Sequence, residues 1–339
     1  MRSLKHIAII TIFTLLLLAQ AGVASATETL IMDNGDRING HLVRMSDGVL
    51  ELETGYAGTI RVGWKHIRTI QSDDTFRIRL TGNEMVSVAS LSRQNDRLLL
   101  DGRSEPFVNV MQINPADWET GDAGRFSGDI DAAFKLDRGN THENRADITA
   151  RVEWKKLQHR IRLGGEVEYS KIDGALSSDR WSIESSYDNN TPKRSFYGAR
   201  TSLKSDRMTD LNLRSAIGPH LGVRIFDTAR TSLSAETGFE YTSERYRGQA
   251  AEKFLAESWR LEFNHFLIPG KLEIYHRNNG LLGLTRSGGV SFDAWNGLKF
   301  PIAGGLNTSA EIKMTYDGDA PADAQSWDIV YRLKIGYQW

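Results

Sequence analysis

The two-residue alternation of residues 327–339 is the feature that most constrains the fold of this chain. Successive side chains of a β-strand point to opposite faces, so an extended segment with this pattern has one apolar face and one polar face. The apolar series is Trp327, Ile329, Tyr331, Leu333, Ile335, Tyr337 and Trp339. Such a series, aromatic at both ends, is typical of a membrane barrel strand, which turns its apolar face to lipid and its aromatic ends to the two interfaces.

The same alternation recurs from Phe126 onward and predicts about twelve antiparallel strands across residues 125–339. An even strand number is typical of single-chain bacterial barrels and returns the chain to the side from which it entered. The predicted connections alternate between short and mostly longer ones. The short ones are Lys156–His159, Asn189–Lys193, Asp227–Arg230, Pro269–Gly270 and Pro301–Gly305, and the longer ones are Lys171–Arg180, Ser205–Asp210, Ser243–Lys253, Arg277–Gly288 and Asp317–Ser326. We therefore expect an all-β fold with a transmembrane barrel.

The first 26 residues have the pattern of a signal peptide for export. Arg2 and Lys5 are basic, Ile7–Leu18 is apolar but shorter than a membrane-spanning helix, and Ala24-Ser25-Ala26 fits the small-residue cleavage rule. The alternative is a retained membrane anchor. The chain contains no cysteine, which excludes disulfides and thiolate chemistry. Its 42 basic and 43 acidic residues are balanced and give no indication of a nucleic-acid partner.

Residues 27–102 predict a small periplasmic β domain. Asn34-Gly35, Asp47-Gly48 and Gly82-Asn83 are turn signals between short apolar strands. The pattern of residues 30–54 is echoed by residues 76–101, so a two-copy repeat of SH3-like or Sm-like sheets is expected. The domain is interpreted either as a module that binds an unknown periplasmic partner or as a spacer beneath the barrel. Residues 103–124, which contain Pro106 and Pro115, are predicted to be a linker.

The polar faces of the predicted barrel strands carry charges of both signs. They predict either a narrow water-filled pore of mixed charge or a lumen closed by cross-strand ion pairs. A strongly selective channel is expected to show one dominant sign of charge. The lumen-facing candidates are Asp147, Arg151, Glu153, Arg162, Glu166, Arg214, His220, Arg224, Glu236, Arg260, Glu311, Arg332 and Lys334.

Catalytic and metal-binding patterns are weak in this sequence. An outer-membrane lipase needs an outward-facing Ser–His pair, and the alternation turns His220 inward. A protease-like barrel needs clustered Asp and His, and the sequence scatters them. The acidic loop Asp317–Asp323 resembles a calcium loop but lacks the downstream bidentate Glu. We therefore predict no catalytic residue, metal or cofactor, with an outer-membrane hydrolase and a soluble periplasmic β protein as the alternatives.

The barrel segment resembles a known family. Leu136-Asp137-Arg138-Gly139-Asn140-Thr141 is similar to the Gly-Asn-Thr/Ser turn of a family of unknown function, whose members are described as salt-induced outer-membrane proteins. The similarity extends over most of residues 126–339. It implies a β-barrel in the outer membrane of a Gram-negative bacterium and a link to osmotic or envelope stress, and it implies no reaction.

The same resemblance implies partners. We expect contact with outer-membrane lipid and lipopolysaccharide. The terminal strand is similar to the signal read by the barrel-assembly machinery, and this likeness assigns an assembly role to Tyr337 and Trp339. The sequence thus predicts a non-enzymatic, porin-like barrel that is either structural or a narrow pore for small solutes.

Overall fold

The computed structural model describes residues 28–46, 48–82, 84–137, 142–191, 194–228, 230–285, 289–318 and 325–339. The chain divides into two compact units, Met1–Ala116 and Asp117–Trp339. The predicted signal peptide, the Gly139-Asn140-Thr141 turn and most of the Asp317–Asp323 loop lie outside the described residues, as do Asp47 and Asn83 of two predicted turns.

The first unit is a single antiparallel sheet with two short 3₁₀ helices. The strand order is β4-β3-β2-β1-β5-β6-β7-β8, and β9 pairs with β2 and β5. The elements are β1 (Glu28–Met32), β2 (Arg37–Ser46), β3 (Val49–Thr54), β4 (Gly58–Gly63), η1 (Trp64–His66), β5 (Ile67–Leu80), β6 (Met85–Gln94), β7 (Arg97–Leu100), β8 (Arg103–Pro106), η2 (Phe107–Asn109) and β9 (Val110–Ile113).

The same order of elements occurs twice in this unit. Four strands and a 3₁₀ helix are followed by a strand that pairs back onto the first. In the first copy the beginning of β5 pairs with β1, and in the second copy β9 pairs with the end of β5. Trp64 of η1 and Phe107 of η2 stack with their ring centroids 5.5 Å apart, so the two copies share one apolar core.

The first part of the predicted linker belongs to this unit, which corrects the sequence interpretation. Residues 103–113 form β8, η2 and β9, and Ile113 is fully buried in the core. Pro106 misled the prediction because it removes a ladder donor, yet a sheet edge tolerates that loss and β8 is an edge strand. Helix α2 (Asp117–Thr120) follows, and no described helix is long and apolar enough to cross a bilayer.

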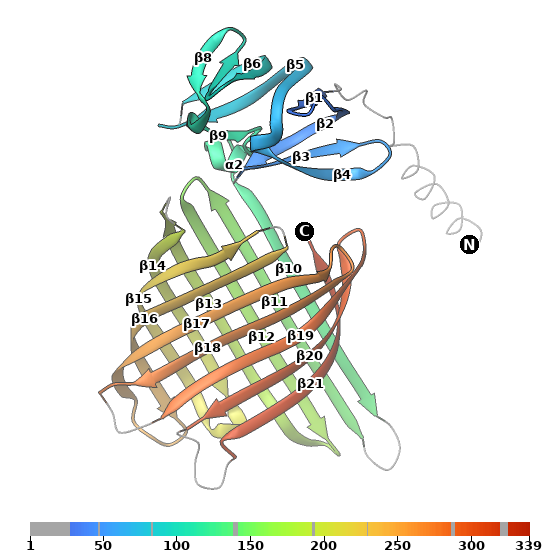
Figure 1. Cartoon of the computed structure of the whole chain (residues 1–339). Coiled ribbons are helices and arrows are strands. Elements are labelled where there is room, and N and C mark those ends of the chain that lie inside the picture. The colour runs from blue at the N-terminus through green and yellow to red at the C-terminus, as the bar shows by residue number, and fades with distance from the viewer. Residues whose placement is uncertain are drawn as a thin grey trace, which may run out of the picture. The chain divides into compact units, whose positions relative to one another are not determined.

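The second unit is a closed barrel in which each strand pairs antiparallel with its neighbours from β10 to β21, and β21 pairs with β10 (Figure 1). Its strands are β10 (Arg125–Asp137), β11 (Glu143–Lys156), β12 (His159–Ile172), β13 (Ala175–Asn190), β14 (Ser195–Asp206), β15 (Leu211–Asp227), β16 (Thr231–Tyr246), β17 (Glu252–Ile268), β18 (Leu272–Gly283), β19 (Val290–Ala303), β20 (Leu306–Asp317) and β21 (Trp327–Gln338); η3 (Arg207–Thr209) lies between β14 and β15. The predicted twelve-stranded barrel is confirmed.

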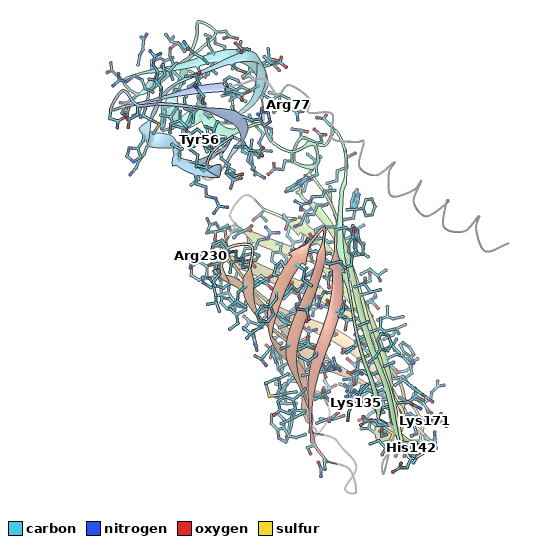
Figure 2. All side chains as sticks on the ribbon, turned by 90° about the vertical axis from the view of Figure 1, so that its right-hand side faces the viewer. Tyr56, Arg77, Lys135, His142, Lys171 and Arg230 are labelled. Atoms are coloured by element: carbon cyan, nitrogen blue, oxygen red, sulfur yellow. The ribbon has the colours of Figure 1, made fainter. Side chains whose placement is uncertain are left out.

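The two ends of the barrel differ in their connections. We call the end with residues 157–158, 191–194, 228–230, 269–271 and 304–305 the short-turn end, and the opposite end the loop end. Figure 2 shows Lys135, His142 and Lys171 at the loop end and Arg230 at the short-turn end. The start of β10 and the end of β21 both lie at the short-turn end, because the strand number is even.

Several strands extend further toward the loop end than the alternation predicts. The predicted connection Lys171–Arg180 is a tight turn at Asp173-Gly174, and Arg277–Gly283 of another predicted connection belongs to β18. Gly174 has a φ of 81°, the left-handed conformation that a two-residue hairpin turn requires. The alternation does not predict these strand ends because polar side chains interrupt the outward-facing apolar series there.

Candidate functional site: the barrel lumen

The lumen contains two clusters of buried charges built from strands that are far apart in the sequence. Each inward-facing side chain is placed by the two-residue period of its strand, which alternates with the exposed apolar side chains of the outer face. We call them the Arg332 cluster and the Glu236 cluster, after the residue that joins most of the strands in each. Together they include nine of the sequence-predicted residues, namely Asp147, Glu166, Glu311, Arg332, Lys334, Arg162, His220, Glu236 and Arg260.

The Arg332 cluster lies on β11, β12, β20 and β21. The Arg332 side chain is 1% exposed, and its guanidinium lies 2.8 Å from a Glu166 carboxylate oxygen, 3.3 Å from Glu311 and 3.4 Å from Asp147. It also pairs with Glu168, a carboxylate that Lys313 and Arg180 contact from other strands. Each of these buried carboxylates therefore has more than one cationic partner, which offsets the cost of removing its charge from water.

Two further groups complete the Arg332 cluster. The Lys334 ammonium lies 2.7 Å from Glu311. The buried Tyr275 hydroxyl donates to the second oxygen of the same carboxylate at 2.9 Å. Glu311 on β20 is thus held by side chains from two other strands, β18 and β21.

The Glu236 cluster lies on β12–β17. Arg162 donates to Glu236 at 2.7 Å, and Arg200 and Arg260 approach the other Glu236 oxygen at 3.4 and 4.0 Å. Asp188, which is fully buried, accepts from Arg160 at 2.7 Å and lies 2.7 Å from the Nε2 atom of His220. The side chain of Arg260 also pairs with Glu184 on β13.

The remaining four predicted residues have their nearest partners outside the two clusters, although Glu153 also lies 3.9 Å from Arg160 of the Glu236 cluster. Arg151 pairs with Asp129, Glu153 with Lys155, Arg214 with Glu244, and Arg224 donates to Asn190. Sequence reasoning missed Arg180, Asp188, Lys204, Tyr275 and Asp293. Each of them has the inward parity of its strand, but most stand beside a predicted connection, where the alternation was not followed to its end.

Several ion pairs join strands that are not neighbours in the barrel and therefore cross the lumen. Lys204 on β14 lies 3.0 Å from Asp293 on β19, and Lys313 on β20 lies 3.0 Å from Glu166 on β12. Arg162 and Glu236 likewise join β12 to β16. The interior is consequently bridged in several directions at once.

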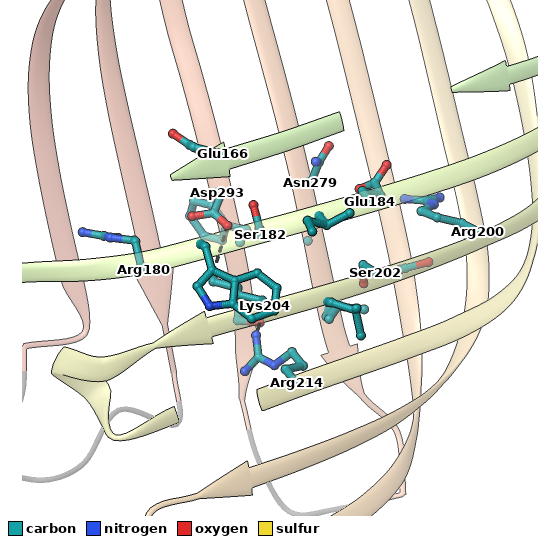
Figure 3. A pocket seen from close by; sticks show the side chains of 18 of the residues that line it. Glu166, Arg180, Ser182, Glu184, Arg200, Ser202, Lys204, Arg214, Asn279 and Asp293 are labelled. Atoms are coloured by element: carbon teal, nitrogen blue, oxygen red, sulfur yellow. Dashed lines mark hydrogen bonds and ion pairs between the residues drawn. The ribbon is translucent and has the colours of Figure 1, made fainter. Parts of the chain in front are cut away.

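Among the described residues, a larger and a smaller cavity lie between these bridges. The larger has a volume of about 750 Å³ and reaches the short-turn end, where Arg125, Ser127, Arg230 and Gln338 line it. The smaller has a volume of about 130 Å³ and lies nearer the loop end, among Arg180, Lys204, Arg214 and Asp293 (Figure 3). The walls of both carry positive and negative side chains.

The strands that close the barrel, β10 and β21, pair over only part of their length. Their backbone register runs from Asp129↔Gln338 to Ala132↔Ile335, whereas β20 and β21 pair over their whole length. Toward the loop end, side chains join β21 to strands beyond β10. Arg332 reaches Asp147 on β11 and Glu166 on β12, and Asp328 pairs with Arg180 on β13. Ion pairs thus replace a backbone ladder over this part of the seam.

The outer surface of the barrel is mostly apolar between two aromatic rims. Phe292, Tyr316 and Trp327 form a ring cluster at the loop end, with centroid distances of 4.9 to 5.6 Å. Tyr337 and Trp339 stack at the short-turn end with centroids 6.2 Å apart, and both are about half exposed. An apolar band between aromatic girdles is the surface expected of a barrel in lipid.

The described residues do not assemble a recognisable catalytic site. His220 lies on the inner face with its Nε2 atom against Asp188, and its Nδ1 atom has no hydrogen-bond partner there. No serine hydroxyl contacts the ring among the described hydrogen bonds, and Phe196 packs against it edge-on. No group of three metal-ligating side chains was found in the described part of the chain.

Comparison with protein families gives a match to the model described as "Protein of unknown function, DUF481" over residues 130–339. The chain belongs to the DUF481 family. This membership agrees with the family of unknown function that the barrel segment resembles, and it assigns no activity.

Individual known proteins share less with this DUF481 chain. A stretch of 108 residues is 30% identical to beta-galactoside alpha-2,6-sialyltransferase 2 of Rattus norvegicus and covers 30% of this chain but 20% of that protein. Among solved structures, the NanC porin is 7% identical, with a TM-score of 0.40 over 63% of this chain and all of that one. The translocator domain of autotransporter NalP from Neisseria meningitidis is 12% identical, with a TM-score of 0.35 over 64% of this chain and 88% of that one.

Proposed function

We propose that this DUF481 protein is an integral outer-membrane barrel whose lumen is closed by ion pairs and whose role is structural rather than catalytic. The observation that carries the proposal is the bridging of the lumen by pairs between non-neighbouring strands, above all Lys204 with Asp293 and Arg162 with Glu236. An open pore would leave such charges hydrated and apart. The apolar outer band and the aromatic rims support a location in lipid.

Conductance measurements test the closed lumen. The purified full chain would be inserted into planar lipid bilayers, and insertion would be verified by heat-modifiable migration in gels. We expect no steady conductance, because ions must break buried pairs to pass. A steady, voltage-independent conductance from the unmodified chain would contradict a closed lumen.

A second candidate is a narrow pore for small polar solutes, and the cavity of about 750 Å³ favours it. Its walls carry both signs of charge, so the expected selectivity between cations and anions is weak. The same bilayer measurement separates the two candidates, since only the pore predicts steady current. The stress link implied by the family stays a prediction, which growth of a deletion strain at high osmolarity would test.

We also propose that the first unit lies in the periplasm. The support is topological: β10 begins at the short-turn end, and the longer connections lie at the loop end, as in barrels whose longer loops are extracellular. The chain has no cysteine, so a single introduced cysteine is the only thiol that a reagent can label. A membrane-impermeant thiol reagent added to whole cells should label a cysteine at Gln249 and not one at Asn34. Labelling at Asn34 would contradict this orientation.

A further inference from the structure

The outer face of the barrel carries a group of polar side chains on two adjacent strands, β18 and β19. Arg260, Tyr275 and Asp293 point into the lumen, so the alternate residues of β17, β18 and β19 point outward. His276, Asn278 and Asn296 occupy such outward positions near the middle of β18 and β19. We call these three residues the exterior polar patch.

The exterior polar patch stands out against the rest of the outer surface. At central outward positions of the other strands, the described residues are apolar, aromatic, glycine, or Ser and Thr, with Glu257 on β17 as the exception. Glu257 pairs in register with Leu282, nearer the loop end than the patch, and accepts from Thr237 at 3.4 Å. Ser and Thr can return their hydroxyl to a nearby carbonyl, whereas amide and imidazole groups present more donors and acceptors than one strand satisfies.

The hydrogen bonds within the patch are incomplete. Asn278 accepts from the Trp259 indole at 2.6 Å, and its own amide donates to the Asp293 carbonyl at 3.4 Å. The Nδ1 atom of His276 lies 2.7 Å from the Asn296 Oδ1 atom. No described contact engages His276 Nε2 or the Asn296 amide nitrogen. A polar group without a hydrogen-bond partner in hydrocarbon costs several kcal/mol of free energy. We therefore expect these groups to have a hydrogen-bond partner within the membrane.

We propose that the exterior polar patch is the interface through which two copies of this chain associate in the membrane. The inference rests on the proposed membrane location. Imidazole and amide groups both donate and accept, so the patch is complementary to itself under a twofold axis, as an isologous interface requires. Acyl chains offer no hydrogen-bond partner, and a soluble protein cannot reach mid-membrane height.

Cysteine cross-linking in native membranes tests this interface. Leu298→Cys places a thiol on the outward face of β19 beside Asn296, and Leu163→Cys places one at a similar depth on β12, distant from the patch. Mild oxidation should give a disulfide-linked dimer for Leu298→Cys and at least about tenfold less for Leu163→Cys. Adding His276→Leu and Asn296→Leu to Leu298→Cys should lower dimer yield by a similar factor while the barrel still inserts, since leucine suits a lipid-facing position.

The outcomes are distinct. Absence of a dimer for Leu298→Cys, an equal yield for Leu163→Cys, or an unchanged yield with both leucine substitutions would overturn the inference. A cross-link from Leu298→Cys to a different protein would also overturn it. Heat-modifiable migration of each variant reports membrane insertion independently. Failure of the unmodified chain to insert would refute the proposed location, whereas insertion without cross-linking would refute only the dimer.

Discussion

Replacing Arg332 by methionine should destabilise the barrel more than removal of any single surface charge. Arg332→Met keeps an unbranched apolar stem and removes the guanidinium with its charge and its hydrogen bonds. The guanidinium contacts Asp147, Glu166, Glu168 and Glu311, and the side chain is 1% exposed. The substitution therefore leaves four carboxylates, each with one cationic partner fewer.

The magnitude follows from the partners that remain. Removing one member of a buried ion pair costs about 3–5 kcal/mol, because the other charge stays buried without compensation. Here Glu166 and Glu168 keep Lys313, and Glu311 keeps Lys334. We therefore expect a loss near the lower limit, about 3 kcal/mol in the free energy of unfolding. Adding Glu166→Gln should restore about half of that loss, since without Arg332 the Glu166 carboxylate shares its remaining partner Lys313 with Glu168.

The assay is reversible urea unfolding of the full chain in lipid vesicles, followed by tryptophan fluorescence. Arg247→Met is the matched control, because the side chains of Arg247 and its partner Asp210 are 61% and 59% exposed. Exposed pairs contribute about 0–1 kcal/mol, so the control should change stability little. If Arg332→Met lowers stability by no more than the control does, the cluster does not hold the seam.

Three other predictions follow from the structure. Ile148→Arg, on the outward face of β11, should lower the free energy of unfolding in vesicles by about 2–4 kcal/mol, whereas Thr149→Arg, which faces the larger cavity, should be tolerated. Equal losses of stability in the two variants would refute the inward and outward assignment of β11. The backbone amides of Ala89 and Ser90 donate hydrogen bonds to the Asp101 carboxylate and lower its pKa. The resulting stabilisation is present above the unfolded pKa of about 3.9 and is lost as the pH falls through the folded pKa. Hydrogen exchange at these two amides should show this pH dependence, and Asp101→Asn should abolish it. Deletion of residues 337–339 should cause periplasmic accumulation and degradation if Tyr337 and Trp339 act as an assembly signal, and full insertion on membrane fractionation would exclude that role.

The alternation of apolar and polar residues was sufficient to predict the barrel because its period is a local property of each strand. It also placed the thirteen lumen candidates on one face of their strands. It could not predict which charges meet, because pairs such as Lys204 with Asp293 join strands that are distant in sequence and depend on barrel closure. Arg180 and Asp188 were missed for a simpler reason, since they lie beside predicted connections where the strands continue.

Strand β18 shows where the alternation fails as a predictor. Leu272 and Ile274 predict a short strand, yet β18 continues to Gly283. His276, Asn278 and Gly280 take the outward positions that apolar residues occupy elsewhere, so the lipid-facing signal disappears although the strand does not. On β18 the failure coincides with His276 and Asn278 of the exterior polar patch, and departures from a local pattern of this kind are expected where a surface has a partner.

The β10–β21 seam suggests why a barrel would retain so many buried charges. Buried ion pairs are often poorer stabilisers than apolar side chains of similar volume, so stability alone does not explain the Arg332 cluster. At the loop end of the seam, however, β21 has no register partner on β10 beyond Ala132↔Ile335. Arg332 and Asp328 instead join β21 to β11, β12 and β13. The inward residue of β10 at this level is Ala133, whose small side chain leaves room for these contacts. The charges therefore specify where the last strand meets the first ones, a function that apolar side chains, which lack directional partners, would perform less well.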